Sequence, residues 1–341
     1  MPGLLLDTLN GKRATQVPLW LMRQAGRYLP EYRDLRARKG GFLAMAYDSE
    51  AACEITMQPI DRFGFDGAIL FSDILIVPHA LGQKLEFLAG EGPKLSPPLV
   101  DRSLDELTRD PSRYLPIYET VRRCRQRLPE GVTMLGFAGS PWTVATYMIA
   151  GEGSHDQHDA RALAYRDPEA LQVIIDAIVD ETIVYLSGQI EAGAEAVQLF
   201  DSWAGSLAPD EFERWVIAPN ARIVAALTEK HPEVPVIGFP KGSGEKLPAY
   251  ARETGVKAVG IDETLDPVCI ARELPENMPV QGNLDPLLLL AGSDHLEKRV
   301  KIILEAFADR PHVFNLGHGI DRRTPIEHVE RLIAAVRGWR G

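Results

Sequence analysis

The feature that most constrains the fold of this chain is a recurrence of eight short runs of apolar or β-branched residues, nearly all separated by helical patterns. Most runs lack the polar–apolar alternation of a half-exposed antiparallel strand, and continuous apolar runs are typical of parallel strands covered on both faces. The runs cover residues 18–22, 67–71, 133–137, 196–200, 235–239, 258–261, 280–283 and 312–316. Eight strands alternating with helices predict an α/β fold, a (β/α)8 TIM barrel with its active site at the C-terminal ends of the strands.

The helical patterns between the runs agree with a barrel. Asp48-Ser49 is a natural N-cap pair for a helix over 49–63, and further helices are expected over 168–192 and 209–230. A last helix opens at 324–327. The alternative is an open, doubly wound sheet, but no GxGxxG motif follows any early strand, so the dinucleotide-binding fingerprint of that fold is missing.

The length of 341 residues fits one large α/β domain or two ordinary ones. No linker separates two cores, so we expect a single barrel domain over 1–341 with an N-terminal arm over about 1–16. Two segments are too long for plain barrel loops. The Gly- and Pro-rich segment near 78–110 is expected to cover the barrel, and the segment near 149–166 to form a mobile lid or rim loop.

The formal net charge of −11 argues against nucleic acid or an anionic membrane as a partner. The charge is unevenly distributed, because residues 12–39 hold eight Lys/Arg residues but only Glu31 and Asp34. A basic island in an acidic protein indicates a local site for an anion. A solvated arm is an equally good interpretation of its outer residues.

The three cysteines, Cys53, Cys124 and Cys269, lie far apart, and no Cys/His cluster has metal-ligand spacing. Neither a disulfide framework nor a metal site is therefore expected. His155 and His158 lie in a polar loop and are best interpreted as surface residues. Because the apolar run at the N-terminus is too short for a signal peptide and no run reaches membrane-spanning length, we expect a cytoplasmic protein in a reducing compartment.

Polar residues gather after the C-terminal ends of the predicted strands, whereas the N-terminal ends carry no comparable set. In chain order these residues are Arg23, Arg27, Asp73, Ser140, Thr143, Tyr147, Asp201, Ser202, Lys241, Asp262, Asn283, Asp285 and His318. TIM barrels carry their active sites at this end. The one-sided distribution therefore indicates an active site.

Arg23 and Arg27 stand at the mouth of a core strand, where an unpaired guanidinium is costly. They bind either an anion that they share or carboxylates of the chain itself, and these two residues alone do not distinguish the alternatives.

Other members also have structural interpretations. Asp73 could cap a helix, as could Asp201 with its neighbour Ser202. Tyr147 could be an ordinary core side chain, and so could His318, although the glycines on both sides of His318 allow close approach of a ligand. Phe42 could line a pocket or anchor the core.

Two long segments resemble signatures of the uroporphyrinogen decarboxylase family. Residues 18–32 read PLWLMRQAGRYLPEY and resemble the first signature, and residues 136–151 read GFAGSPWTVATYMIAG and resemble the second. Further similar segments, FSDIL, LFDSWAG and NLGHG, cover 71–75, 199–205 and 315–319 in the expected order. The resemblance extends over about residues 18–329.

The resemblance implies a barrel enzyme of haem synthesis, usually a homodimer, that needs neither cofactor nor metal. Members of the family convert the four acetate side chains of the tetrapyrrole uroporphyrinogen III to methyl groups, giving coproporphyrinogen III and four CO2. Position by position, it implies catalytic roles for Asp73, Arg23, Tyr147 and His318. The implied substrate contacts are Arg23, Gln24, Ala25, Gly26, Arg27, Phe42, Asp73, Tyr147, Ser202 and His318.

These residue types suit that chemistry. A substrate with eight carboxylates favours a cationic mouth, and arginine binds carboxylates bidentately. Loss of CO2 leaves a carbanion equivalent, for which a pyrrole ring protonated at carbon is the electron sink. An ionised Asp73 would accept hydrogen bonds from pyrrole N–H groups and stabilise the cationic ring. The proton donor is left open between Arg23, His318 and water.

Two other classes compete with this interpretation. A zinc-dependent cobamide or folate methyltransferase of the same barrel superfamily would need cysteine and histidine ligands at the strand ends, yet no cysteine lies beside a strand-end histidine. A non-enzymatic tetrapyrrole carrier would not require Asp73.

Overall fold

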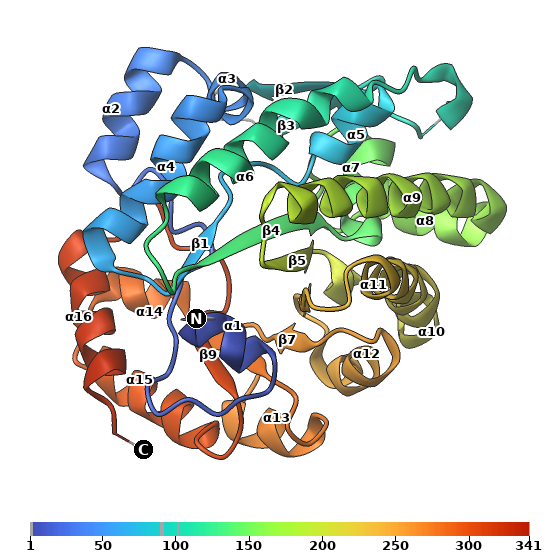
Figure 1. The fold of residues 1–341 in the computed structure, drawn as a ribbon. Coiled ribbons are helices and arrows are strands. Elements are labelled where there is room, and N and C mark those ends of the chain that lie inside the picture. The colour runs from blue at the N-terminus through green and yellow to red at the C-terminus, as the bar shows by residue number, and fades with distance from the viewer. Residues whose placement is uncertain (1–2, 89–91, 101, 341) are drawn as a thin grey trace.

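The computed structural model describes residues 3–88, 92–100 and 102–340. Its main sheet has seven parallel strands in the order β1-β4-β5-β6-β7-β8-β9, and helices surround the sheet (Figure 1). The strands are β1 (Gly67–Ile69), β4 (Thr133–Gly139), β5 (Ala196–Asp201), β6 (Val236–Pro240), β7 (Ala258–Gly260), β8 (Val280–Leu284) and β9 (His312–Leu316). Almost every residue of these strands is buried, which confirms the prediction of parallel strands covered on both faces.

Most helices alternate with the strands and pack on the outside of the curled sheet, whereas α1 lies in front of its centre (Figure 1). They are α1 (Leu4–Leu9), α2 (Pro30–Lys39), α3 (Phe42–Tyr47), α4 (Ser49–Phe63), α5 (Ile76–Leu81), α6 (Leu115–Arg127), α7 (Pro141–Ala150), α8 (His158–Arg166), α9 (Pro168–Ala192), α10 (Pro209–Phe212), α11 (Ala218–Lys230), α12 (Leu247–Glu253), α13 (Pro267–Glu273), α14 (Pro286–Ala291), α15 (His295–Ala306) and α16 (Ile326–Gly338). The predicted TIM-barrel-like fold is confirmed.

The predicted first strand, residues 18–22, differs from the prediction because it makes a single parallel bridge, Leu19 to Phe314 of β9. Phe314 N donates to Pro18 O at 2.8 Å on one side, and Asp66 N, just before β1, donates to Leu19 O at 3.0 Å on the other. The segment thus lies between the two edge strands. It lacks a regular ladder because side chains take its donors: Leu19 N donates to the Asp66 carboxylate, and proline has no N–H.

Local signals set most helix boundaries as predicted. Asp48 Oδ1 accepts from the N–H groups of Glu50 and Ala51, and α4 begins at Ser49. The long helix over 168–192 is confirmed as α9. The predicted helix over 209–230 is instead divided into α10, a π-helical turn over Glu213–Ile217, and α11.

The segment near 78–110 carries a hairpin of β2 (Lys84–Leu88) and β3 (Gly92–Ser96). The hairpin contacts the other predicted covering segment, because Leu95 N donates to Gly151 O at 2.7 Å and Lys94 bridges Glu152. The end of that segment, predicted as a loop, forms α8. Residues 89–91 and 101 of the first segment lie outside the described residues.

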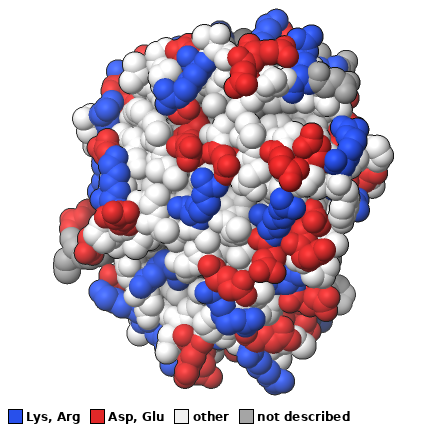
Figure 2. All heavy atoms as spheres, turned by 90° about the vertical axis from the view of Figure 1, so that its right-hand side faces the viewer, with Lys and Arg blue, Asp and Glu red and all other residues white. Residues whose placement is uncertain are grey.

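The face that carries α9 and α11 mixes acidic and basic side chains without a region of one sign (Figure 2). Ion pairs contribute to this mixing, since Arg222 contacts Asp176 and Lys230 Nζ lies 2.7 Å from Glu191 Oε1. In the described part of the chain, no helix is long and apolar enough to cross a membrane.

Candidate active site

Six of the eight basic residues in the island over residues 12–39 separate into two groups in three dimensions. Its outer members form ion pairs: Lys12 with Asp7, Arg13 with Asp309, Arg38 with Glu54 and Lys39 with Asp48. Arg23 and Arg27 are exposed, and among the described residues no carboxylate lies within ion-pair distance of either guanidinium. These two arginines are therefore available to an external anion.

Arg23 is held in an uncommon backbone conformation, with φ at +59° in the left-handed region. The fully buried Gln24 supports this turn, because its Nε2 donates to Gly67 O at 2.9 Å and its Oε1 accepts from Leu21 N at 3.0 Å. Both ends of the Gln24 amide are thus engaged by backbone. The Gln24 side chain therefore supports the turn that carries Arg23, and its contact with a substrate stays a prediction.

Ala25 and Gly26 are half-buried between the two arginines. Phe42 packs against Phe71 at 5.1 Å between ring centroids and against Phe87 at 4.7 Å. Because Phe71 follows β1 and lies two residues before Asp73, Phe42 belongs to the apolar surroundings of that carboxylate.

Asp73 lies beyond β1, and its Oδ1 accepts from Leu75 N at 2.9 Å. Burial raises the pKa of Asp73 to about 6, although the Leu75 amide and the positive charge of Arg23 act in the opposite direction. The Asp73 side chain is half-buried and not fully enclosed. Its carboxylate is desolvated by the neighbouring apolar side chains. A carboxylate that is costly to ionise in the free protein is suited to stabilise a cation.

Tyr147 of α7 faces the same charges. Burial raises the pKa of Tyr147, the negative charge of Asp73 raises it further, and Arg23 lowers it. Arg23, Asp73 and Tyr147 come from three different strand ends and lie within electrostatic reach of one another.

His318 follows β9 and stacks on Phe239 of β6, with 6.4 Å between ring centroids and an interplanar angle of 25°. The pKa of His318 is lowered to about 3, mainly by burial and also by the charges of Arg23 and Lys241, while Asp262 acts in the opposite direction. The imidazole is therefore neutral at neutral pH. The structure thus groups four residues from the sequence prediction: Arg23, Asp73, Tyr147 and His318.

The end of β5 is organised by a buried threonine. Thr143 Oγ1 donates to Asp201 Oδ1 at 2.5 Å and accepts from Trp203 N at 3.0 Å. Asp201 is fully buried, and burial raises its pKa to about 7. This network links the end of β5 to the first turn of α7 and fixes the backbone around the half-buried Ser202.

Lys241 belongs to this end of the barrel, as its position after a predicted strand indicated, although the family resemblance implied no role for it. It follows β6, its ammonium lies 3.9 Å from Glu263 Oε1, and its charge acts on His318. The neighbouring Asp262 accepts from Gly242 N at 2.7 Å. The signal for Lys241 was its strand-end position. Among the residues described, no group of three or more His, Cys, Asp or Glu side chains is arranged to hold a metal ion.

Comparison with known proteins identifies the family. The family described as uroporphyrinogen decarboxylase (URO-D) matches residues 2–339. The uroporphyrinogen decarboxylases of Novosphingobium aromaticivorans and Erythrobacter litoralis are each 71% identical to the chain over 339 residues, which cover 99% of both sequences. The chain belongs to the uroporphyrinogen decarboxylase family.

Solved structures place the uroporphyrinogen decarboxylase fold beside that of methyltransferases. A methyltransferase from Methanosarcina mazei superposes with a TM-score of 0.79 at 19% identity, covering 97% of this chain and 96% of that one. A B12-independent methionine synthase from a Shewanella species gives 0.60 at 10% identity, covering 96% and 95%. At these identities the likeness concerns the fold alone.

Proposed function

We propose that the chain removes the carboxyl groups of the four acetate side chains of uroporphyrinogen III without a cofactor, giving coproporphyrinogen III and four CO2. Uroporphyrinogen decarboxylase activity in haem biosynthesis, a carboxy-lyase reaction, follows from the family match and the 71% identity. The identity of the substrate isomer and the roles of individual residues are our proposal.

The observation that carries these roles is the proximity of two opposite charges, those of Arg23 and Asp73, at the end of the barrel where the strands terminate. Arg23 has no ion-pair partner among the described carboxylates, while its charge acts on Asp73, Tyr147 and His318. A polycarboxylate substrate supplies the missing anion, and its pyrrole ring supplies a cation for Asp73 once it is protonated.

In the proposed reaction, a pyrrole carbon next to the reacting acetate takes up a proton and the ring becomes cationic. The ionised Asp73 accepts hydrogen bonds from pyrrole N–H groups and stabilises this charge. The C–C bond to the carboxyl group then breaks, its electron pair enters the ring, and CO2 leaves. Protonation of the resulting exocyclic carbon completes the methyl group, and loss of the first proton from the ring carbon restores the neutral pyrrole.

The charge state of His318 bears on the proton donor. With a pKa of about 3 in the free protein, His318 is no source of an imidazolium proton at neutral pH. A carboxylate of the bound substrate would raise the pKa of His318 by partly cancelling the charges of Arg23 and Lys241. We therefore propose that His318 donates a neutral hydrogen bond to the substrate, and that water or Arg23 delivers the proton.

The two arginines have different proposed tasks. Arg23, whose charge reaches Asp73, orients the acetate that reacts. The pKa shifts of Asp73, Tyr147 and His318 involve Arg23 but not Arg27, and we assign to Arg27 the carboxylates that do not react. If both arginines bound the reacting carboxylate as tightly in the ground state as in the transition state, they would lower KM without raising kcat. The division of tasks avoids this.

We further propose that the chain acts as a single barrel domain in a cytoplasmic homodimer, with the segments near 78–110 and 149–166 covering the substrate. Sedimentation of the purified protein at two concentrations tests the dimer, and a monomer at both would contradict it.

The decisive experiment is anaerobic incubation of the purified protein with uroporphyrinogen III and chromatography of the porphyrins after oxidation. Stepwise loss of four carboxyl groups is expected in the wild type, and little in Asp73→Asn. Undiminished turnover in Asp73→Asn would refute the role of Asp73, whereas binding without turnover in the wild type would favour a carrier.

A further inference from the structure

The turn that carries Arg23 is bound to the segment that follows from β9. Asn315 Oδ1 accepts a hydrogen bond from Met22 N at 2.9 Å, and Ile320 N donates to Met22 O at 2.9 Å. Both backbone groups of Met22 are therefore held by residues 315–320, which also include His318. The residue directly before Arg23 is thus fixed relative to the loop that carries His318.

Asn315 is fully buried on β9, and its Oδ1 accepts a second hydrogen bond, from Leu316 N at 2.8 Å. Because both donors are backbone N–H groups, this end of the amide is the carbonyl oxygen. Its Nδ2 is buried without a hydrogen-bond partner among the described residues. In the part of the chain that the structure describes, the Asn315 side chain therefore acts through one oxygen atom.

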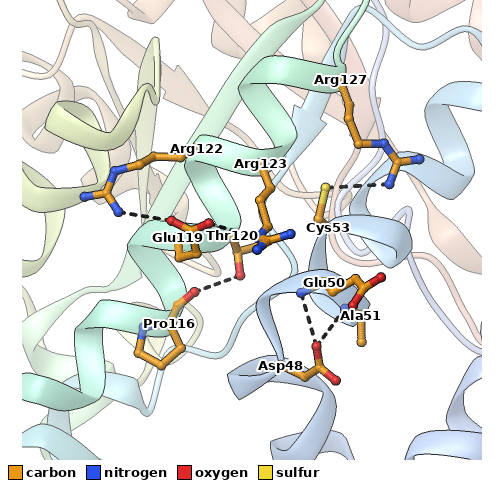
Figure 3. A network of polar contacts seen from close by, with 10 residues as sticks. All are labelled: Asp48, Glu50, Ala51, Cys53, Pro116, Glu119, Thr120, Arg122, Arg123 and Arg127. Atoms are coloured by element: carbon orange, nitrogen blue, oxygen red, sulfur yellow. Dashed lines mark hydrogen bonds and ion pairs between the residues drawn. The ribbon is translucent and has the colours of Figure 1, made fainter.

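The bond between Met22 and Asn315 differs from side-chain bonds that secure a single helix. Thr120 Oγ1 donates to Pro116 O one turn earlier in α6 at 2.9 Å, and Asp48 caps α4 (Figure 3). Met22 N and Asn315, in contrast, are 293 positions apart in the sequence. Their hydrogen bond joins the start of the barrel to its last strand.

We infer that Asn315 is a positioning residue for the reaction, whose Oδ1 holds the Arg23 turn in place beside the loop that carries His318. The inference depends on the function proposed above. Arg23 has a φ of +59°, which is costly for a residue with a side chain, so the turn needs support from its neighbours. Gln24 supplies support through Gly67 O before β4, and Asn315 supplies it from β9.

The test compares two substitutions of Asn315. Asn315→Leu removes the acceptor at similar size, and it should lower kcat for uroporphyrinogen by about tenfold to a hundredfold with a smaller change in KM. Asn315→Asp keeps an acceptor oxygen and loses only an N–H group without a described partner, so it should retain more of the wild-type kcat. Equal losses of kcat in the two variants would overturn the inference.

A second measurement follows the position of Arg23 without substrate. Since the charge of Arg23 contributes to the low pKa of His318, a displaced Arg23 should raise that pKa in Asn315→Leu. Titration of the His318 ring by NMR on the folded protein measures it. Wild-type kcat together with an unchanged pKa of His318 would overturn the inference. Should Asn315→Leu fail to fold, Asn315→Ala is tested by the same criteria.

Gln198→Leu is the matched control. Gln198 is also fully buried on a barrel strand, and its Oε1 accepts from Gln281 Nε2 at 3.1 Å, away from the Arg23 turn. This variant should lose stability but keep the wild-type kcat and the pKa of His318, and an equal loss of kcat would contradict a specific role of Asn315. A wild type that does not decarboxylate would refute the proposed function instead, because the titration of His318 needs no turnover.

Discussion

The aliphatic part of the Arg23 side chain lies against Gly319, so that a Cβ atom at position 319 would stand 2.3 Å from Arg23 Cδ and 2.7 Å from Arg23 Cγ. The backbone of Gly319 is not in the left-handed region, so an alanine there is not strained in itself. The absence of a side chain at 319 therefore defines where Arg23 lies, across the gap between the start and the end of the barrel.

Gly319→Ala should displace Arg23 and lower kcat/KM for uroporphyrinogen by about tenfold to a hundredfold, since small misplacements of positioning groups carry such losses. The melting temperature should change little, because a flexible side chain can move aside. Gly338→Ala, where an added Cβ meets nothing within 4 Å, is the control. Wild-type kinetics in Gly319→Ala would refute the dependence of Arg23 on this contact.

Arg23→Lys and Arg27→Lys should affect different kinetic constants. Lysine keeps the charge but loses the planar fork that binds a carboxylate bidentately. Because Arg23 is proposed to orient the reacting acetate, Arg23→Lys should lower kcat by about tenfold or more. Arg27→Lys should mainly raise KM. Steady-state kinetics with uroporphyrinogen distinguish these effects, and equal losses confined to KM in both variants would argue against the division of roles.

Asp73→Asn should lower activity and raise stability together. Removal of a preorganised charged group costs about 3–4 kcal/mol of transition-state stabilisation, or two to three decades in kcat. The pKa of Asp73 is raised to about 6 in the folded protein, above its unfolded value, so the folded state loses stability as the pH rises from about 4 to 6. The asparagine variant does not ionise at position 73 and therefore does not lose this stability.

Urea unfolding at several pH values measures the second effect. Above pH 6 the variant should gain up to about 3 kcal/mol, the equivalent of about two pKa units, and the gain should vanish below about pH 4. The amide oxygen can still accept from Leu75 N, which keeps the local turn. A variant that is less stable than the wild type at pH 7 would show that Asp73 is not desolvated as described.

Lys241→Met should raise the pKa of His318, because the ammonium charge of Lys241 contributes to its depression to about 3. The titration of the His318 ring, followed by NMR on the folded protein, measures the change. Lys301→Met is a suitable control, since Lys301 is exposed on α15 and pairs with Glu305. An unchanged pKa of His318 in Lys241→Met would exclude Lys241 from its electrostatic surroundings.

Thr143→Val should destabilise the fold, because it leaves the Trp203 N–H and a carboxylate oxygen of Asp201 without their partner in a buried region. Unsatisfied buried groups typically cost about 1–3 kcal/mol each. Thr143→Ser keeps the hydroxyl and should lose much less. Chemical denaturation of the three proteins provides the comparison, and equal stability of the Val and Ser variants would contradict the role of the hydroxyl.

Much of the fold was predictable because its signals are local. Burial on both faces shows as continuous apolar runs, and caps such as Asp48 show as single residues before a helical period. Residues 18–22 were the exception. Their apolar character predicted a strand. Whether a regular ladder forms depends on their hydrogen bonds with Asp66 and Phe314, which lie far away in the sequence.

The sequence by itself determined the barrel order, the end of the barrel that carries polar residues, and the family, since each depends on residue types at short spacing or on long contiguous motifs. Only the tertiary structure decided which charges are compensated: it pairs Arg13 with Asp309 and Arg38 with Glu54, and places no carboxylate of the described residues within ion-pair distance of Arg23. It also decided the pKa of Asp73, which is raised by burial. The physical reason is that desolvation and Coulomb energy depend on neighbours brought together from distant parts of the chain, whereas propensity and periodicity do not.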